Sequence, residues 1–570
     1  MAYGVAGCAF EQPEHPNFKG GGKLMTESVY NRREFIALAS LALSAPAISS
    51  ALAETSEEVQ CLIYDAQGEP LPPSALERSH LCDSLMRPFT VPFESDSGRI
   101  RFTPPSDKPF RISVPLTVPG FGQVFVYADD GGQGYTPRTP SGANPLVLNY
   151  AFARDRMATV RKVEADCKKL GVVITPKTQQ RIDSAQASLT RSEAARTDRT
   201  AQVRASMESL RDSLWAGEML VISRAQNTIA RRLPRKGFLF GCNGFGLAQG
   251  YPETSKQFEA VFNYTTIPIY EGWVEPEKGH PDYSFFEAAL NTLVGTTILP
   301  KGHPGIWLEP ENTPKWLQNL SYDETKQYCL DHVRQAISRY RHRVHIWDVA
   351  NEAHVQPETD RGMNGFSREE NVDMTVGALR TAHEADPTCF RIINLTGTWA
   401  DYYMGEHPGG SQWQRRPAPW QQSPYDYLSM LRNAEAGYEA IGLQYYHSGR
   451  DMLEWERDVD SFNHFAKPIH ITEMGFPCSL APFPGQEKYA YWGGGNGGEA
   501  MIWHNEFTET VQADWVESVY TIAYSKPWVE AISYWDFDGK GHDGFVTTEG
   551  KPRESYHRLQ ALLAKWRDEG

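Results

Sequence analysis

The chain has 570 residues, of which 40% are hydrophobic and 22% are charged, so it can form two or three domains with a sizeable core. It carries 56 Lys and Arg residues against 71 Asp and Glu residues, a formal net charge of −15. This balance argues against a dedicated nucleic-acid-binding protein, which needs a basic surface, and it is compatible with a neutral ligand such as a glycan.

The first segment of the chain has the order of a twin-arginine export signal. The pair Arg32-Arg33 precedes an apolar run from Ala37 to Ile48, and Ala51-Leu52-Ala53 offers a cleavage site of small residues. We therefore expect residues 1–53 to be an N-terminal extension and signal peptide, and the protein to be periplasmic or secreted. A buried helix of the mature protein is the alternative, and we expect no membrane span in the mature protein.

Residues 57–150 have the pattern of short strands separated by Pro and Gly turns. The alternating or apolar stretches are Val59–Tyr64, Arg99–Phe102, Phe110–Val114 and Gln123–Tyr127. They predict a small antiparallel β-sandwich. The segment contains no Trp, so a spacer or docking role is as well supported as glycan binding.

Residues 151–235 change to a composition that favours helix. Gln179 to Arg232 contains no Pro, and apolar residues such as Val203, Met207 and Leu210 follow helical spacing. The pattern predicts a helical linker with one long amphipathic helix that packs on a neighbour.

From residue 236 to residue 570 strands and helices alternate. Eight apolar strand candidates stand at Gly237–Cys242, Ala260–Ile267, Thr296–Lys301, Val344–Val349, Phe390–Leu395, Ala440–Tyr445, Pro468–Thr472 and Ala531–Trp535. Eight strands with intervening helices predict a (β/α)8 TIM barrel. The predicted fold is therefore α/β, with the barrel preceded by the β-sandwich and the helical segment.

Two of these strands end in a glutamate, which is where a barrel of this kind places its reactive groups. Glu352 follows the fourth strand and Glu473 ends the seventh. Two carboxyl groups about 5–5.5 Å apart across the mouth perform retaining glycoside hydrolysis, in which one is protonated and the other attacks the anomeric carbon.

The motifs around both glutamates resemble those of glycoside hydrolase family 10, the β-1,4-xylanases. The matching segments are Trp347–Ala353 and Ile471–Glu473. The resemblance implies that Glu352 is the acid/base, that Glu473 is the nucleophile and that Asn351 contacts the sugar 2-hydroxyl. It implies neither a cofactor nor a metal.

The resemblance also implies further substrate-binding residues on the other strands. They are His303, Trp307, Asn263, Gln444, Tyr446, His447 and Trp535. Other positions depart from the family pattern, because Pro268, Ile269 and Gly272 stand where the family has Glu, Asn and Lys, and Tyr446 stands where it has His.

We therefore expect a retaining glycoside hydrolase that cleaves a β-linked polysaccharide or oligosaccharide and is most similar to an endo-β-1,4-xylanase. The alternatives are a hydrolase of a different or decorated β-glycan and a catalytically silent carbohydrate-binding protein. The presence of both glutamates argues against the silent protein.

The cysteines have no pattern of a metal or disulfide site. Seven follow the predicted signal, and no two of them form a C-x-x-C pair. They are predicted to be scattered structural thiols.

Overall fold

The structure is a computed structural model that describes residues 58–568 with gaps. The gaps are residues 77, 90, 92, 105–107, 137–144, 233, 250–251, 311, 356–365, 401–421, 447–448, 480–500, 505 and 539–542. The predicted export signal lies outside the described residues. Within them, no helix is both long enough and apolar enough to cross a membrane.

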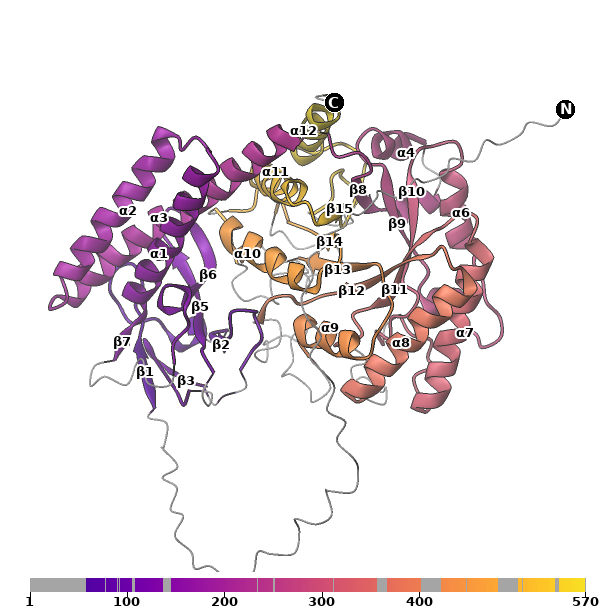
Figure 1. Ribbon diagram of the computed structural model, residues 1–570, viewed down its shortest axis with the longest axis horizontal. Coiled ribbons are helices and arrows are strands. Elements are labelled where there is room, and N and C mark those ends of the chain that lie inside the picture. The colour runs from indigo at the N-terminus through magenta and orange to yellow at the C-terminus, as the bar shows by residue number, and fades with distance from the viewer. Residues whose placement is uncertain are drawn as a thin grey trace, which may run out of the picture. The chain divides into compact units, whose positions relative to one another are not determined.

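The first described segment forms two small sheets (Figure 1). One has the order β3-β4-β1-β7 and the other the order β2-β5-β6. The strands are β1 (Val59–Leu62), β2 (His80–Cys82), β3 (Phe93–Asp96), β4 (Arg99–Phe102), β5 (Arg111–Val118), β6 (Gly122–Ala128) and β7 (Leu146–Val147). All four predicted strands are present, although β7 pairs with β1 in parallel, which the antiparallel prediction did not include.

Three helices follow: α1 (Leu148–Lys169), α2 (Pro176–Ala194) and α3 (Arg199–Arg232). The predicted long helix is α3, which buries Val203, Met207 and Leu210 against its neighbours, and the chain turns between α2 and α3. The side chain of Asp198 accepts a hydrogen bond from the Ala201 N–H (3.1 Å), as helix-starting residues do. Gly217 leaves room on α3 for the side chain of Arg156 from α1, since a Cβ there would lie 2.7 Å from a guanidinium nitrogen of Arg156.

The remaining strands close into a parallel barrel in the order β10-β11-β12-β13-β14-β15-β8-β9, which confirms the predicted (β/α)8 fold. They are β8 (Leu239–Asn243), β9 (Tyr264–Pro268), β10 (Leu299–His303), β11 (Ile346–Asn351), β12 (Phe390–Leu395), β13 (Ala440–Tyr445), β14 (Ile469–Met474) and β15 (Val529–Tyr534). The helices are α4 (Pro252–Glu259), α5 (Glu271–Val274), α6 (Ser284–Thr292), α7 (Tyr322–Tyr340), α8 (Arg368–Ala385), α9 (Pro424–Asn433), α10 (Met452–Phe462), α11 (Glu509–Ser525) and α12 (Glu554–Asp568).

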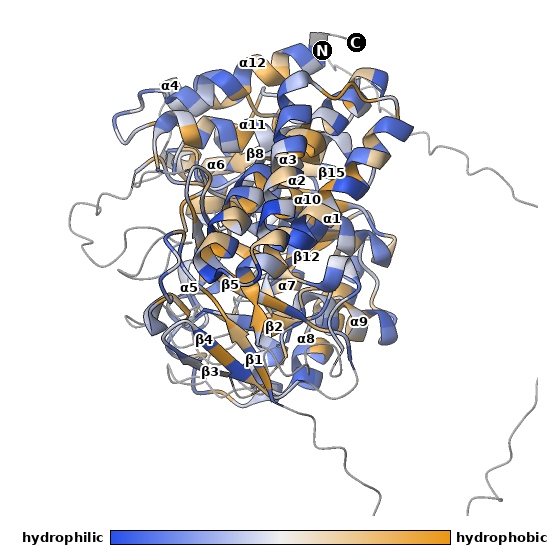
Figure 2. Cartoon of the chain, turned by 90° about the vertical axis from the view of Figure 1, so that its left-hand side faces the viewer, coloured by the Kyte–Doolittle hydropathy of each residue, from blue (hydrophilic) through white to orange (hydrophobic). Residues whose placement is uncertain are grey.

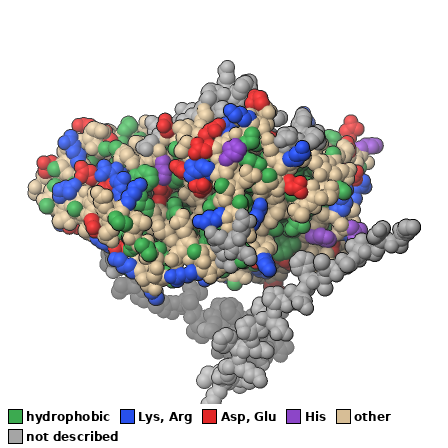
Figure 3. All heavy atoms as spheres, turned by 90° about the horizontal axis from the view of Figure 1, so that it is seen from above, with side chains coloured by type: hydrophobic (Ala, Val, Ile, Leu, Met, Phe, Trp, Pro, Cys, Tyr) green, Lys and Arg blue, Asp and Glu red, His purple; other side chains and the backbone are tan. Residues whose placement is uncertain are grey.

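The burial pattern explains this arrangement. The barrel strands are almost continuously buried, as expected of parallel strands covered by helices. The helices carry apolar and polar faces, visible as two-coloured ribbons in Figure 2. On the face shown in Figure 3, acidic and basic side chains are interspersed.

Residues 56–570 form one compact unit. The residue limits predicted for separate domains stay a prediction. The seven cysteines in the described part are free and buried, in agreement with structural thiols.

Candidate active site

Glu352 and Glu473 come from barrel strands that lie three positions apart in the ring. Glu352 directly follows β11, and Glu473 lies at the carboxyl end of β14. Each is only 5% exposed. Glu352 has a φ of +54°, a conformation that is uncommon for residues other than glycine, and its N–H donates to the Asn394 carbonyl oxygen (2.8 Å). The sheet backbone therefore fixes the direction in which this side chain points.

The carboxylate of Glu473 is surrounded by hydrogen-bond donors. Its Oε1 accepts from Asn394 Nδ2 (2.7 Å) and from Gln444 Nε2 (3.2 Å). Its Oε2 accepts from the hydroxyl of Tyr446 (2.5 Å). Three donors on one carboxylate stabilise its negative charge, as a nucleophile requires.

The carboxyl group of Glu352 has a different environment. Its Oε2 accepts a hydrogen bond from the indole N–H of Trp307 (2.9 Å). Burial first, and then the nearby charge of Glu473, raise the pKa of Glu352 well above its usual range, although hydrogen bonds from Gln444 and Trp307 oppose the shift. A carboxyl group that favours its protonated form, beside a carboxylate held by three hydrogen-bond donors, is suited to the acid role, and its neighbour to the nucleophile role.

Two side-chain amides join Asn351 to Glu473. Asn351 Oδ1 accepts from Asn394 Nδ2 (2.7 Å) and from Gln444 Nε2 (3.2 Å). The same two amides donate to Glu473, so Asn351 and Glu473 are held in one network. The network orients the Asn351 amide with its oxygen inward.

A buried ionic group lies beneath the site. Asp348 Oδ2 contacts Lys301 Nζ (2.5 Å) and His303 Nδ1 (2.7 Å), and all three side chains are buried. Burial alone would raise the pKa of Asp348, but Lys301 and His303 together lower it below its usual value. Because Nδ1 of His303 is held by Asp348, its Nε2 is directed toward Glu473 Oε1, 3.7 Å away.

Aromatic rings surround these polar groups. The ring of Tyr270 lies 5.1 Å from that of Trp307 and 4.9 Å from that of Trp273. The ring of Trp535 lies 5.5 Å from that of His303. Such ring faces suit the apolar faces of pyranose sugars, and Trp273 is 46% exposed.

The structure therefore brings most of the predicted site residues together, with two exceptions. Asn263 precedes β9, at the end of the barrel opposite the glutamates, and its side chain bonds the Phe240 N–H (2.8 Å) and the Phe238 carbonyl (3.1 Å). The prediction that Asn263 binds substrate was wrong, because this amide joins two strands at their amino ends. His447 lies outside the described residues.

Glu271 is a buried residue that the sequence did not indicate. It is fully buried, and its Oε1 accepts a hydrogen bond from the backbone N–H of Trp307 (2.9 Å). Burial raises the pKa of Glu271 to about 8. Glu271 thus holds the backbone of the residue whose indole contacts Glu352.

A parallel barrel with two buried carboxyl groups of unlike environment at its mouth has the arrangement that a retaining glycoside hydrolase requires. A model of glycosyl hydrolase family 10 matches residues 271–542, which include both glutamates. The barrel belongs to this family.

The similar proteins include several that are named xylanases. Endo-1,4-beta-xylanase B of Thermotoga neapolitana is 27% identical over 354 residues, which cover 57% of this chain and 88% of that protein. Endo-1,4-beta-xylanase 1 of Arabidopsis thaliana is 21% identical over 300 residues, 52% of this chain and 26% of that protein. The structure of xylanase 10B from Thermotoga petrophila RKU-1 in complex with xylobiose covers 58% of this chain and 94% of its own, with 19% identity and a TM-score of 0.43.

Proposed function

We propose that this hydrolase cleaves the β-1,4-linked backbone of xylan by double displacement, with Glu473 as nucleophile and Glu352 as acid/base. The observation that carries the assignment is the unlike surroundings of the two carboxyl groups. Glu473 accepts three hydrogen bonds, whereas burial and the charge of Glu473 favour the protonated form of Glu352. Similarity to proteins named endo-1,4-beta-xylanase supports the choice of substrate.

In the first step, a carboxylate oxygen of Glu473 forms a bond to the anomeric carbon. The bond from that carbon to the leaving sugar breaks, and the departing oxygen takes its proton from Glu352. The product is a covalent glycosyl-enzyme and a Glu352 carboxylate. In the second step, Glu352 removes a proton from a water molecule, which attacks the same carbon and releases Glu473.

The remaining polar residues would hold the sugar at the cleavage point. Asn351 is placed to contact the 2-hydroxyl, because its amide is oriented by Asn394 and Gln444. His303 has its Nε2 directed toward the nucleophile, and Trp307 and Trp535 supply ring faces beside it. In this proposal Tyr446 serves chiefly to hold Glu473.

The side of the site that departs from the family pattern would bind sugar through aromatic faces. A side chain at Gly272 has no room, because a Cβ there would lie 2.4 Å from the Asn312 carbonyl oxygen. A lysine therefore does not fit at this position, while Tyr270 and the exposed Trp273 stand next to it. Stacking tolerates side groups on a sugar better than directed hydrogen bonds do, so decorated xylans are included among the expected substrates.

The test is release of reducing sugar from xylan, arabinoxylan and mixed-linkage β-glucan. Wild-type protein should degrade the xylans, and Glu473→Gln should lower the rate by more than about 10³-fold. Glu549→Gln alters an exposed carboxylate in a turn and serves as the matched control, with an unchanged rate. Activity on β-glucan alone would replace the proposed substrate, and an active Glu473→Gln would overturn the assignment of the nucleophile.

We further propose export through the twin-arginine pathway, on the order of residues 32–53 in the sequence. Intact mass of the exported protein should correspond to a chain that begins after Ala53. Replacing both Arg32 and Arg33 with Lys should retain the protein in the cytoplasm. Export of that variant in cleaved form would contradict the proposal.

A further inference from the structure

Strand β6 has its outer edge covered by two loops of the barrel. In its sheet the order is β2-β5-β6, so β6 is an edge strand, and its outer side faces no further strand of that sheet. The Gln123 N–H donates to the Ile502 carbonyl (2.7 Å), and the Phe125 N–H donates to the Gly449 carbonyl (3.0 Å). Gly449 belongs to the loop after β13, and Ile502 to the loop after β14. Two barrel loops therefore complete the hydrogen bonding of this edge.

Glu218 on α3 ties the same two loops together. It is only 3% exposed. Its Oε1 accepts from the Met452 N–H (3.0 Å) and from the indole N–H of Trp503 (2.7 Å), and its Oε2 lies 2.7 Å from His504 Nε2. Met452 begins α10 after the first loop, and Trp503 and His504 belong to the second. One carboxylate thus binds both loops from outside the barrel.

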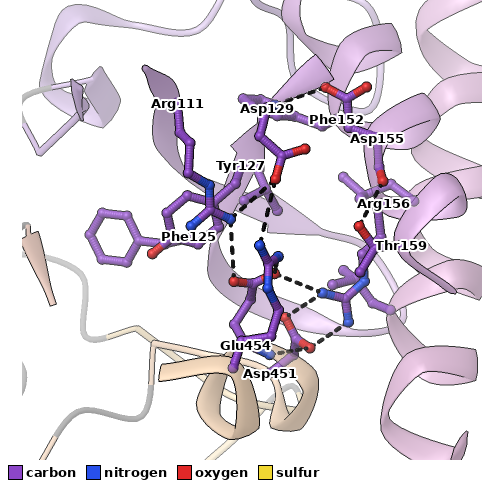
Figure 4. A pocket seen from close by; sticks show the side chains of 14 residues that line it. Arg111, Phe125, Tyr127, Asp129, Phe152, Asp155, Arg156, Thr159, Asp451 and Glu454 are labelled. Atoms are coloured by element: carbon purple, nitrogen blue, oxygen red, sulfur yellow. Dashed lines mark hydrogen bonds and ion pairs between the residues drawn. The ribbon is translucent and has the colours of Figure 1, made fainter. Parts of the chain in front are cut away.

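A buried ionic cluster fixes the start of α10 (Figure 4). Arg156 on α1 binds Asp451 through Nη1 (3.2 Å) and contacts Glu454 (3.4 Å), and Arg111 on β5 contacts Glu454 (3.4 Å). Asp451 caps α10 by accepting from the Leu453 N–H (3.0 Å). Burial alone would raise the pKa of Glu454, but the surrounding arginine side chains lower this pKa to about 2. The arginine side chains therefore favour the charged carboxylate, which forms the ion pairs of this cluster.

The first loop carries Tyr446, which contacts the nucleophile, and the second loop follows the strand that carries Glu473. Tyr446 stands three positions before Gly449, and Glu473 stands three before Phe476, whose ring meets that of Trp503 edge-on (6.0 Å, 79°). The loops also contact each other, since a Cβ at Gly449 would lie 3.0 Å from the Met501 Cβ. A shift of either loop would move Tyr446 relative to Glu473.

We propose that the N-terminal module, residues 58–232, is a positioning scaffold for the active site, in which β6 and Glu218 hold the two loops that keep Tyr446 on Glu473. This inference rests on the proposed function of Glu473. Glu218 is a positioning residue, because it contacts neither carboxyl group of the reaction. The module would be required for turnover itself, in contrast to a detachable glycan-binding domain.

The experiment compares two buried carboxylates of the same helix in the full-length protein. Glu218→Ala removes the tie to the loops. Asp212→Ala is the matched control, because Asp212 is equally buried but bonds only to residues of the module, such as Ser184 (2.6 Å) and Arg211 (3.0 Å). Both variants are assayed for kcat and KM on xylohexaose, and for amide hydrogen exchange in peptides covering 443–453 and 473–479.

Glu218→Ala should lower kcat by about tenfold or more with a smaller change in KM, and it should speed exchange in both barrel peptides. Asp212→Ala should leave kcat and those peptides unchanged. The inference is overturned if Glu218→Ala keeps kcat within about twofold of wild type, or if both variants lose kcat equally. Should Glu218→Ala fail to fold, Gln123→Pro removes the N–H that β6 donates to Ile502, together with the Gln123 side chain, and the same outcomes apply.

Hydrogen exchange separates this inference from the proposed function. If wild-type protein cleaves no xylohexaose, the proposed function fails. Unchanged exchange in Glu218→Ala would then overturn the scaffold as well, and faster exchange would support it.

Discussion

The hydrogen bond from Trp307 to Glu352 predicts the direction in which the pH dependence of the enzyme will move when it is removed. In Trp307→Phe the carboxylate of Glu352 loses the indole donor that lies 2.9 Å away, while the phenyl ring keeps much of the apolar cover. A hydrogen bond of this kind contributes about 0.5–1.5 kcal/mol. At 1.36 kcal/mol per pKa unit, its loss raises the pKa of Glu352 by about 0.4–1.1 units.

The sign of the effect follows from the role of Glu352 as an acid. Activity falls as pH rises through the pKa of the group that must donate a proton, so a higher pKa moves the alkaline limb to higher pH. The assay is kcat/KM for a xylo-oligosaccharide across the pH range, because a natural leaving group needs the proton. The limb of Trp307→Phe should lie about half a unit to one unit above that of wild type.

A second tryptophan supplies the control. Trp316 donates its indole N–H to the Glu275 backbone carbonyl (3.1 Å) and contacts no carboxylate of the site. Trp316→Phe should leave the alkaline limb in place even if it lowers stability. A limb that stays fixed in Trp307→Phe, or that moves to lower pH, would refute the reasoning.

Two buried carboxyl groups give predictions about stability. The pKa of Glu271 is raised to about 8, so the folded protein keeps a proton that the unfolded chain releases above about pH 4.3, and wild-type stability falls as pH rises between these values. Glu271→Gln should remove this contribution to the pH dependence. The contribution is on the order of a few kcal/mol in the free energy of urea unfolding between about pH 5 and pH 8. An unaltered pH dependence would contradict the raised pKa of Glu271. Asp348→Asn leaves the buried Lys301 without its charge partner and should cost about 3–5 kcal/mol at neutral pH. Because the pKa of Asp348 is lowered, its contribution to stability is present at neutral pH and is lost as the carboxylate becomes protonated in acid. The difference between variant and wild type in thermal unfolding should therefore shrink as the pH falls below the ordinary aspartate pKa of about 3.9. A difference that stays constant would argue against the ion pair.

The barrel and its two glutamates could be predicted because both depend on local patterns. Apolar runs alternating with helical periodicity locate the strands to within a few residues, and a parallel barrel gathers the ends of its strands at one mouth. Glu352 and Glu473 stand at such ends, so their meeting follows from topology. The prediction for Asn263 failed for the same topological reason. Asn263 stands before its strand and therefore lies at the opposite end of the barrel.

Other features depend on contacts that no local pattern records. Lys301 and Asp348 lie inside apolar strands, and only the closed barrel shows that they face each other. The break between α2 and α3 had a signal in Asp198, a residue type that starts helices, but no Pro or Gly stands beside it to mark the end of a helix. The contacts of β6 and Glu218 with the barrel join residues more than two hundred positions apart. The sequence predicts that the long helix packs on a neighbour, but no local pattern indicates which part of the chain that neighbour is.

Tyr446 shows how the site retains its chemistry after a change of residue. The hydroxyl of Tyr446 donates to Glu473, at a position where the family pattern has histidine. Burial, together with the charge of Glu473, raises the pKa of Tyr446 well above its ordinary value, so the phenol remains a donor at any pH at which the protein works. A histidine, with an ordinary pKa of about 6.5, would change its charge within that range. The substitution therefore removes one titrating group from the surroundings of the nucleophile.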